Sequence, residues 1–129
     1  LLGWLFILIA LIVKITSKGP AIYYHERIGQ NGTPFHIYKF RTMYTDAEKD
    51  GPELSSENDS RVTPAGKILR KLHLDELPQF YNVLIGDMSI IGVRPEREYY
   101  IQQIIKKMPH YSLALKNKPG ITSWGQLMF

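Results

Sequence analysis

The stretch LDELPQFYNVLIGDMSIIGVRPE, residues 74–96, contains the clearest helix signals in this 129-residue chain. Asp75 is a suitable N-cap for a helix, and Glu76 and Pro78 are residue types that favour its first turn. Gly86 is a suitable stop, because glycine readily adopts the left-handed backbone conformation found after a helix. The stretch therefore predicts a helix capped by Asp75 and ended by Gly86.

Two further helices are predicted, one on each side of this stretch. Upstream, Thr63 is the expected N-cap and Pro64 the first residue of a helix, since the first turn needs no N–H from proline. Downstream, Arg94 and Pro95 are expected to open a helix through about Met108, with isoleucines at helical spacing on one face.

Two strands are predicted in the first third of the chain. Residues 21–25 and 34–40 are rich in aromatic and β-branched side chains, and Asn31 and Gly32 between them are a turn signal, so a β-hairpin is expected. Residues 46–60 are expected to be a mobile loop. Together the elements predict an α+β fold, a mainly helical single domain with a small β-hairpin.

Charge is unevenly distributed along the chain. The net charge is +4, but residues 46–59 hold six acids and one base, so that segment carries −5 and the remainder +9. A basic turn is expected at 116–122. The basic body indicates an anionic partner: a phosphate, a membrane surface or nucleic acid. The absence of Cys excludes a disulfide scaffold and a thiolate metal site.

Residues 1–13, LLGWLFILIALIV, carry no polar side chain and are expected to form a helix with residues 14–16. Such a run makes a helix of about 20 Å, whereas a bilayer core needs about 30 Å. Three interpretations stay open: a buried core helix, half of a spanning helix, or half of a re-entrant or interfacial helix. Lys14 and Lys18 suit anionic headgroups on the cytoplasmic side. Both ends of the chain are interpreted as cut.

Asp75 and Glu76 are the first candidates for chemistry. At a helix start, their carboxylates lie beside backbone N–H groups that favour negative charge and also attract phosphate. Mg²⁺ often bridges one or two carboxylates and a substrate phosphate, so this pair is a candidate metal site. The competing interpretation is an ordinary helix cap.

Four cations are candidates for phosphate binding. Lys39 and Arg41 are two residues apart on a strand, so both can face one anion. Arg70 lies on the helix that leads to the carboxylate pair, and Arg94 precedes a helix start, where an Arg fork and N–H groups make a phosphate clamp. For each of them the alternative is a solvated surface side chain. The histidines show no metal-binding spacing such as HExxH.

Three blocks of this sequence resemble the bacterial sugar transferase family, the monotopic polyprenyl-phosphate phosphoglycosyl transferases. They are GPAIYYHERIGQNGTPFHIYKFRTM at 19–43, LDELPQFYNVLIGDMSIIGVRPE at 74–96 and KPGITSWGQ at 118–126. The blocks follow one another in the family's order and span nearly all of the chain, which makes the resemblance specific.

The resemblance implies transfer of a sugar-1-phosphate from a UDP-sugar to polyprenyl (undecaprenyl) phosphate, with release of UMP and a requirement for Mg²⁺. It implies a covalent intermediate on Asp75, with Glu76 holding Mg²⁺ or orienting the acceptor phosphate. Arg94 would clamp a phosphate. The remaining three cations would shape the anionic pocket or brace the carboxylate pair, and these are Lys39, Arg41 and Arg70.

The resemblance also implies a place for the protein in the cell. Residues 1–16 would be the returning half of a re-entrant helix in the bacterial inner membrane, and residues 17–129 a C-terminally truncated catalytic domain on its cytoplasmic face. The reaction would prime exopolysaccharide, capsule, O-antigen or glycoprotein glycan synthesis. Nucleic acid is not expected as a partner, and a homo-oligomer stays open.

This sequence departs from the family pattern in two of the three blocks. Val93 stands where the family has Pro, and Ser123 and Gly125 stand where it has Gly and Ala.

Two other functions are alternatives to the transferase. A non-catalytic basic membrane module would bind anionic lipid, but such a surface has no use for a carboxylate pair. A Mg²⁺-dependent phosphohydrolase would use similar residues with water as acceptor; the apolar N-terminus favours a lipid acceptor.

Overall fold

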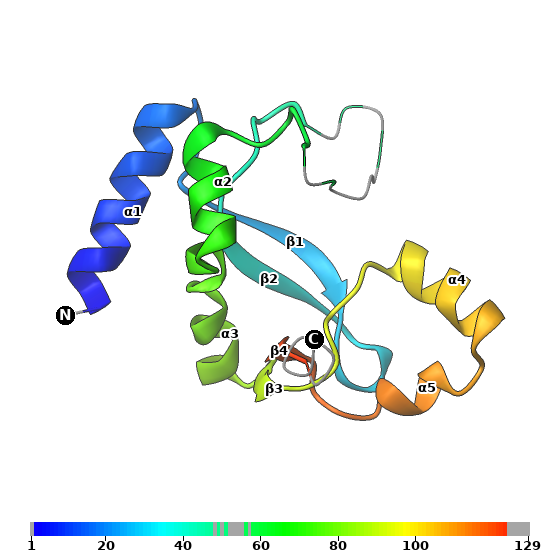
Figure 1. The fold of residues 1–129 in the computed structure, drawn as a ribbon. Helices are drawn as coiled ribbons and strands as arrows, with labels where there is room; N and C mark the ends of the chain where they lie inside the picture. Colours follow the sequence, from blue (N-terminus) through cyan, green and yellow to red (C-terminus); the bar gives the residue numbers. More distant parts are fainter. Residues whose placement is uncertain (1, 48, 50, 52–55, 57, 124–129) are drawn as a thin grey trace. The chain divides into compact units, whose positions relative to one another are not determined.

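The structure is a computed structural model that describes residues 2–47, 49, 51, 56 and 58–123. Within these residues the protein is a small α+β domain with five α-helices and two two-stranded sheets (Figure 1), which confirms the predicted class. Its residues divide into two compact units. The first unit is Leu1–Tyr23 with Lys39–Leu77, and the second is Tyr24–Tyr38 with Pro78–Phe129.

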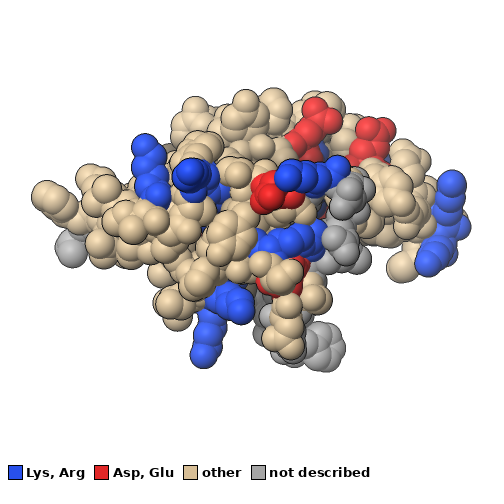
Figure 2. All heavy atoms as spheres, turned by 90° about the horizontal axis from the view of Figure 1, so that it is seen from above, with Lys and Arg blue, Asp and Glu red and all other residues tan. Residues whose placement is uncertain are grey.

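Some predictions fall outside the described residues. These include part of the acidic segment and the end of the third block, so the mobile loop over 46–60 stays a prediction. On the face shown in Figure 2, basic side chains are more widespread than acidic ones, in keeping with the net charge of +4.

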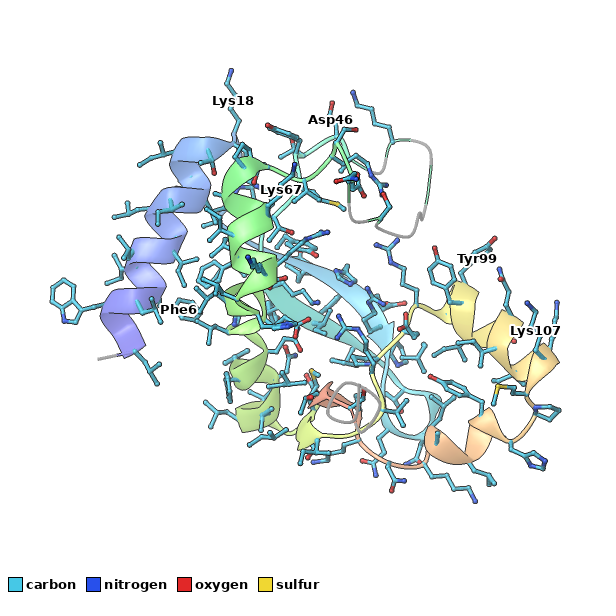
Figure 3. All side chains as sticks on the ribbon, viewed as in Figure 1. Phe6, Lys18, Asp46, Lys67, Tyr99 and Lys107 are labelled. Atoms are coloured by element: carbon cyan, nitrogen blue, oxygen red, sulfur yellow. The ribbon has the colours of Figure 1, made fainter. Side chains whose placement is uncertain are left out.

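The first unit is built on the packing of two helices. Its helical elements are α1 (Leu2–Thr16), α2 (Pro64–Lys71) and the 3₁₀ turn η2 (Leu74–Glu76). Ile9 and Val13 lie four residues apart on one face of α1, and both are buried in a cluster with Phe40 and Leu69. Phe6, labelled in Figure 3, adds its ring to this cluster at 4.7 Å from the ring centre of Phe40. This cluster is the core of the unit.

The other side of α1 is apolar and exposed. Trp4 and Ile15 expose 80% and 84% of their surface, and the exposed side also includes Leu2, Ile7, Leu8 and Leu11. In Figure 3, Lys18 extends away from the end of the helix. Among the described helices, none has both the length and the apolar character that crossing a membrane requires.

The start of α2 is as predicted. Thr63 is extended, its Oγ1 accepts a hydrogen bond of 2.9 Å from Gly66 N, and Pro64 is the first helical residue. A Cβ on Gly66 would collide with the carbonyl oxygen of Thr42, so the helix packs directly on backbone. The cap therefore also fixes α2 against the chain that leaves β2.

The predicted helix capped by Asp75 is wrong at its beginning. Residues 74–76 form η2 instead, and α3 (Gln79–Ile85) begins only after Pro78, with no side-chain cap. Leu77 N donates to Leu74 O at 3.3 Å, the spacing of a 3₁₀ turn, and Pro78 has no N–H with which to continue an α-helical ladder. The predicted stop is confirmed, since Gly86 has φ 92° and caps α3.

The predicted hairpin is confirmed. Its strands are β1 (Ile22–Ile28) and β2 (Pro34–Phe40), which form a two-stranded sheet joined by the turn η1 (Gln30–Gly32). Asn31 and Gly32 have φ of 57° and 75°, the left-handed conformation expected of this pair. β1 extends further than residue 25, where the predicted strand ended.

The second unit contains a parallel strand pair that was not predicted. β3 (Ser89–Ile91) pairs with β4 (Gly120–Thr122), in the register Ser89 to Gly120 and Ile91 to Thr122. The predicted basic turn at 116–122 is therefore wrong in its second half, which is strand. A Cβ on Gly92 would lie 2.6 Å from Lys118 O, so the backbones approach too closely for a side chain.

The predicted helix from Arg94 is also wrong at its beginning. α4 (Glu98–Lys107) starts four residues later, after the extended Arg97, and α5 (Tyr111–Ala114) follows. The delay has a cause in the hairpin. Ile28 N donates to Glu96 O at 3.0 Å, and Arg27 Nη1 donates to Pro95 O at 3.2 Å, so this segment is held extended beside β1.

Candidate functional site

Asp75 is the centre of the candidate site in the first unit. It is the middle residue of η2 and only 8% of its surface is exposed, although carboxylates are seldom buried this far without partners. His73, two residues earlier, has φ 54°, a left-handed conformation that is strained for a non-glycine residue. The sharp turn at His73 ends α2 and directs the chain into η2.

Glu76 is paired with Lys39. Lys39 Nζ donates to Glu76 Oε1 at 2.9 Å, and the two side chains expose only 13% and 11% of their surface. The alternative of a solvated strand edge is thus wrong for Lys39. A largely buried ion pair thus joins the end of β2 to η2, beside Asp75.

Opposing effects act on the Asp75 carboxyl group. Burial raises its pKa most strongly, and the charge of Glu76 acts in the same direction. Lys39 and Arg70 lower the pKa by favouring the carboxylate. Asp75 is therefore a poorly solvated carboxyl group whose ionised form is stabilised by two cations.

Arg70 lies on α2, and its side chain is oriented by Thr42, which follows shortly after β2. Its Nε donates to Thr42 Oγ1 at 2.8 Å, so it is not a solvated helix-face residue. Its charge also lowers the pKa of Asp75 and of Asp59. The predicted placement of Arg70 near the carboxylate pair agrees with these interactions.

Arg41 has a different environment from Lys39. Its guanidinium is buried and donates to Ser17 Oγ, Ser17 O and Gly19 O at 3.2, 2.9 and 3.3 Å. Burial lowers its pKa. A Cβ on Gly19, which has φ 116°, would collide with Arg41 Nη1. The expectation that Lys39 and Arg41 face one anion is wrong, because Arg41 lies beyond the strand and binds the chain that leaves α1.

The carboxylates are a suitable donor set for Mg²⁺. This ion commonly takes one or two protein carboxylates and completes its octahedral shell with waters and substrate phosphate oxygens. Asp75 and Glu76 supply that number. Across the described residues there is no group of three or more Asp, Glu or His side chains that could hold a metal ion. The residues thus fit a magnesium ion shared with a substrate and not an all-protein site.

Arg94 belongs to the second unit and lines a cavity of about 930 Å³ there. Because α4 begins at Glu98, Arg94 has no helix N-terminus beside it, and the predicted clamp of Arg fork and first-turn N–H groups is wrong in that respect. The residue is exposed and lies in the extended segment between β3 and α4.

Several residues with a role in the structure of the two units were not singled out from the sequence. Thr42 orients Arg70, and Asn82, which is fully buried, accepts from Tyr38 N and donates to His36 O. Lys118 and Tyr111 line the cavity with Arg94. Asn82 could have been noticed as a polar residue inside a predicted helix, four residues before its glycine stop. The cavity residues come from separate elements, so no local signal links them.

The site of the first unit combines a buried aspartate with a lysine–glutamate pair and an arginine, and it lies in the same unit as the apolar helix α1. It is a carboxylate centre flanked by cations, and such centres suit the transfer of phosphate-containing groups. The whole chain, residues 1–129, matches the family described as bacterial sugar transferase, and it belongs to this family.

Curated relatives agree with this membership. The UDP-N-acetylgalactosamine-undecaprenyl-phosphate N-acetylgalactosaminephosphotransferase of Aeromonas hydrophila is 43% identical over 119 residues, 92% of this chain and 28% of the relative. The UDP-glucose:undecaprenyl-phosphate glucose-1-phosphate transferase of Klebsiella pneumoniae is 43% identical over 127 residues, 98% of this chain and 27% of the relative. A putative undecaprenyl-phosphate N-acetylgalactosaminyl 1-phosphate transferase of Bacillus subtilis (strain 168) is 43% identical over 106 residues, 82% of this chain and 59% of the relative. The chain thus spans only part of each relative.

Proposed function

We propose that the protein transfers a sugar-1-phosphate from a UDP-sugar to undecaprenyl phosphate and releases UMP. The printed names of the Aeromonas hydrophila and Klebsiella pneumoniae relatives describe such transfers, and the family membership extends over the whole chain. The observation that carries the proposal is the burial of Asp75 beside the Lys39–Glu76 pair and Arg70. A structural helix cap would need neither the burial nor the two cations.

The proposed reaction has two steps that both use Asp75. In the first, an Asp75 carboxylate oxygen bonds to the sugar-linked phosphorus, and the bond from that phosphorus to the bridging oxygen breaks. UMP leaves with the electron pair. In the second, a phosphate oxygen of the lipid acceptor bonds to the same phosphorus and the Asp75 carboxylate leaves. A covalent intermediate divides one difficult transfer into two easier ones.

The neighbours of Asp75 have distinct roles in the proposal. Lys39 and Arg70 favour the ionised, nucleophilic form of the carboxyl group and offset the charge of the phosphates. Asp75 and Glu76 would hold Mg²⁺, which when bound neutralises phosphate charge. Poor solvation of Asp75 leaves its carboxylate less shielded by water, which increases its reactivity.

The exposed apolar side of α1 supports a location at the bacterial inner membrane. A helix that is apolar around its whole circumference, with one side packed and the other exposed, suits contact with lipid. Lys14 and Lys18 are both exposed at its C-terminal end, where anionic headgroups would attract them. We propose that residues 1–16 are a re-entrant membrane element and residues 17–129 a cytoplasmic catalytic domain.

One experiment tests the reaction. The full-length protein is incubated with Mg²⁺, undecaprenyl phosphate and each of a panel of UDP-sugars, and UMP release is followed. Asp75→Asn should abolish release because an amide is a very poor nucleophile for phosphorus. Asp46→Asn is the matched control, since Asp46 is exposed and pairs only with Lys49 at 3.3 Å among the described residues. No UMP from any donor, or full activity of Asp75→Asn, contradicts the proposal.

Product analysis separates the alternatives. A donor labelled in the sugar-linked phosphate should leave label on the protein when the lipid is omitted, and the label should move to lipid when it is added. Label released as free sugar phosphate instead indicates a phosphohydrolase with water as acceptor. Binding of anionic vesicles without any UMP release indicates a non-catalytic module.

A further inference from the structure

The cavity of the second unit has a volume of about 930 Å³ and is lined by parts of five segments. Ligand sites of proteins typically occupy about 300–1,000 Å³. Its polar lining includes Gln30, Arg94, Tyr111, Asn117 and Lys118, and its apolar lining includes Ile104. The cavity is therefore large enough for a small organic ligand and offers both polar and apolar contacts.

The backbone around β3 and β4 brings two basic residues, Arg94 and Lys118, to this cavity. Ser89 N donates to Pro119 O at 2.8 Å, and Gly120 N donates to Val93 O at 2.9 Å. These bonds hold the segment that carries Arg94 beside the segment that carries Lys118. The backbone positions of Arg94 and Lys118 at the cavity thus follow from strand pairing.

The charge balance of the cavity is positive. Its carboxylate, Glu96, is paired with Arg27, whose Nη1 lies 3.2 Å from Glu96 Oε2. Lys118 forms no hydrogen bond or ion pair through its ammonium with any described residue. Burial and Glu96 raise the pKa of Tyr111, so its hydroxyl stays a neutral donor. An anionic ligand is favoured here.

The neutral side chains that line the cavity indicate a ligand with polar groups besides its phosphate. Gln30 Nε2 donates to Lys116 O at 3.1 Å, which orients an amide at the rim, and Asn117 adds a second amide. Amides suit the carbonyl and imide edge of a pyrimidine, and aliphatic side chains such as Ile104 suit its ring faces. A lipid phosphate would bind the two cations, but its hydrocarbon chain has no group that could form hydrogen bonds with the amides.

We propose that this cavity binds the nucleotide portion of the donor, a uridine phosphate, with Lys118 and Arg94 on phosphate oxygens and the amides on the base. This inference rests on the proposed function for the choice of uridine. It assigns to the second unit a nucleotide site of its own, with Lys118 and Asn117 as new binding residues.

Direct binding of UMP to the full-length protein tests the inference without turnover. Lys118→Met should weaken UMP binding about tenfold in equilibrium dialysis, since one charge-assisted hydrogen bond is lost. Asn117→Asp should also weaken it, because a new carboxylate repels phosphate. Lys116→Met is the matched control: Lys116 is also exposed, lies two residues away and is not among the residues that line the cavity. Equal binding by Lys118→Met and wild type overturns the inference.

Competition identifies the source of the phosphate. UMP should displace labelled UMP, whereas inorganic phosphate and farnesyl phosphate at the same concentration should not. Displacement by either at the affinity of UMP overturns the nucleotide assignment. Photo-cross-linking with 4-thiouridine monophosphate should label peptides that contain Tyr111 or Asn117, and labelling confined to peptides of the first unit overturns the location.

Failure of the proposed reaction gives a different result from failure of this inference. Normal UMP release with a donor KM that Lys118→Met leaves unchanged overturns the nucleotide site alone. Lys118-dependent UMP binding with no UMP release from any donor overturns the transferase proposal and supports the site. Both are supported when Lys118→Met raises the KM for UDP-sugar about tenfold and leaves the KM for undecaprenyl phosphate unchanged.

Discussion

Lys39→Met removes the ammonium that lies 2.9 Å from Glu76 Oε1. The two side chains are only 13% and 11% exposed, so the pair resembles a buried ion pair more than a surface one. Breaking a fully buried pair by removing one partner costs about 3–5 kcal/mol, whereas surface pairs contribute about 0–1 kcal/mol. With this slight exposure we expect a loss of about 3 kcal/mol in the free energy of unfolding.

The loss follows from the charge that remains. In Lys39→Met the Glu76 carboxylate stays poorly solvated, and Asp75 loses the cation that most lowers its pKa. Lys39→Met with Glu76→Gln removes that charge and should recover about 2 kcal/mol. Glu76→Gln alone should cost less than Lys39→Met, about 1–2 kcal/mol, because a glutamine oxygen still accepts a hydrogen bond.

Thermal unfolding of the full-length protein in detergent measures these differences. At roughly 3 °C per kcal/mol, Lys39→Met should lower Tm by about 10 °C, and the double variant by about 3 °C. Lys49→Met is the control, because the Lys49–Asp46 pair is 72% and 59% exposed and should shift Tm by less than about 3 °C. Equal Tm values for Lys39→Met and the double variant refute the buried-charge argument.

Three further predictions concern the surroundings of the sites. Thr63→Ala should lower the stability of α2 by about 1 kcal/mol in chemical denaturation, whereas Thr63→Ser keeps the cap. Gly120→Ala should cost about 3 kcal/mol in the same assay and weaken UMP binding, because its Cβ meets the backbone N of Gly92; normal binding would contradict the strand-pair argument. Hydrogen bonds from Arg61 hold the pKa of Asp59 below its ordinary 3.8, so the carboxylate stabilises the fold above that pH and this contribution is lost as the pH falls through the lowered pKa. Asp59→Asn should therefore lower Tm at pH 7 and approach the wild-type Tm in strong acid; a pH-independent difference would contradict this.

Elements bounded by short-range signals could be predicted from the sequence. The Thr63 cap, the turn at Asn31 and Gly32, and the stop at Gly86 each depend on residues within a few positions. The conformations of these residues are limited by side-chain hydrogen bonding or by backbone sterics, so the same signals hold in many folds.

Elements that depend on distant partners could not be predicted in this way. β3 and β4 pair across nearly thirty residues, and both are only three residues long, too short for a period-2 pattern to appear. The delayed start of α4 likewise depends on hydrogen bonds between Glu96 and β1, and no local feature of the segment after Arg94 signals them.

For this protein, sequence by itself determined the start of α2, the end of α3, the hairpin, the membership of the family and the choice of Asp75 and Glu76 as the candidate centre. These follow from residue types, spacing and ordered motif blocks. Only the tertiary structure decided that Lys39 faces Glu76 while Arg41 faces the end of α1, and that Arg94 and Lys118 line one cavity. The physical reason is that burial, charge pairing and strand register depend on contacts between groups far apart along the chain. Local propensities do not predict such contacts.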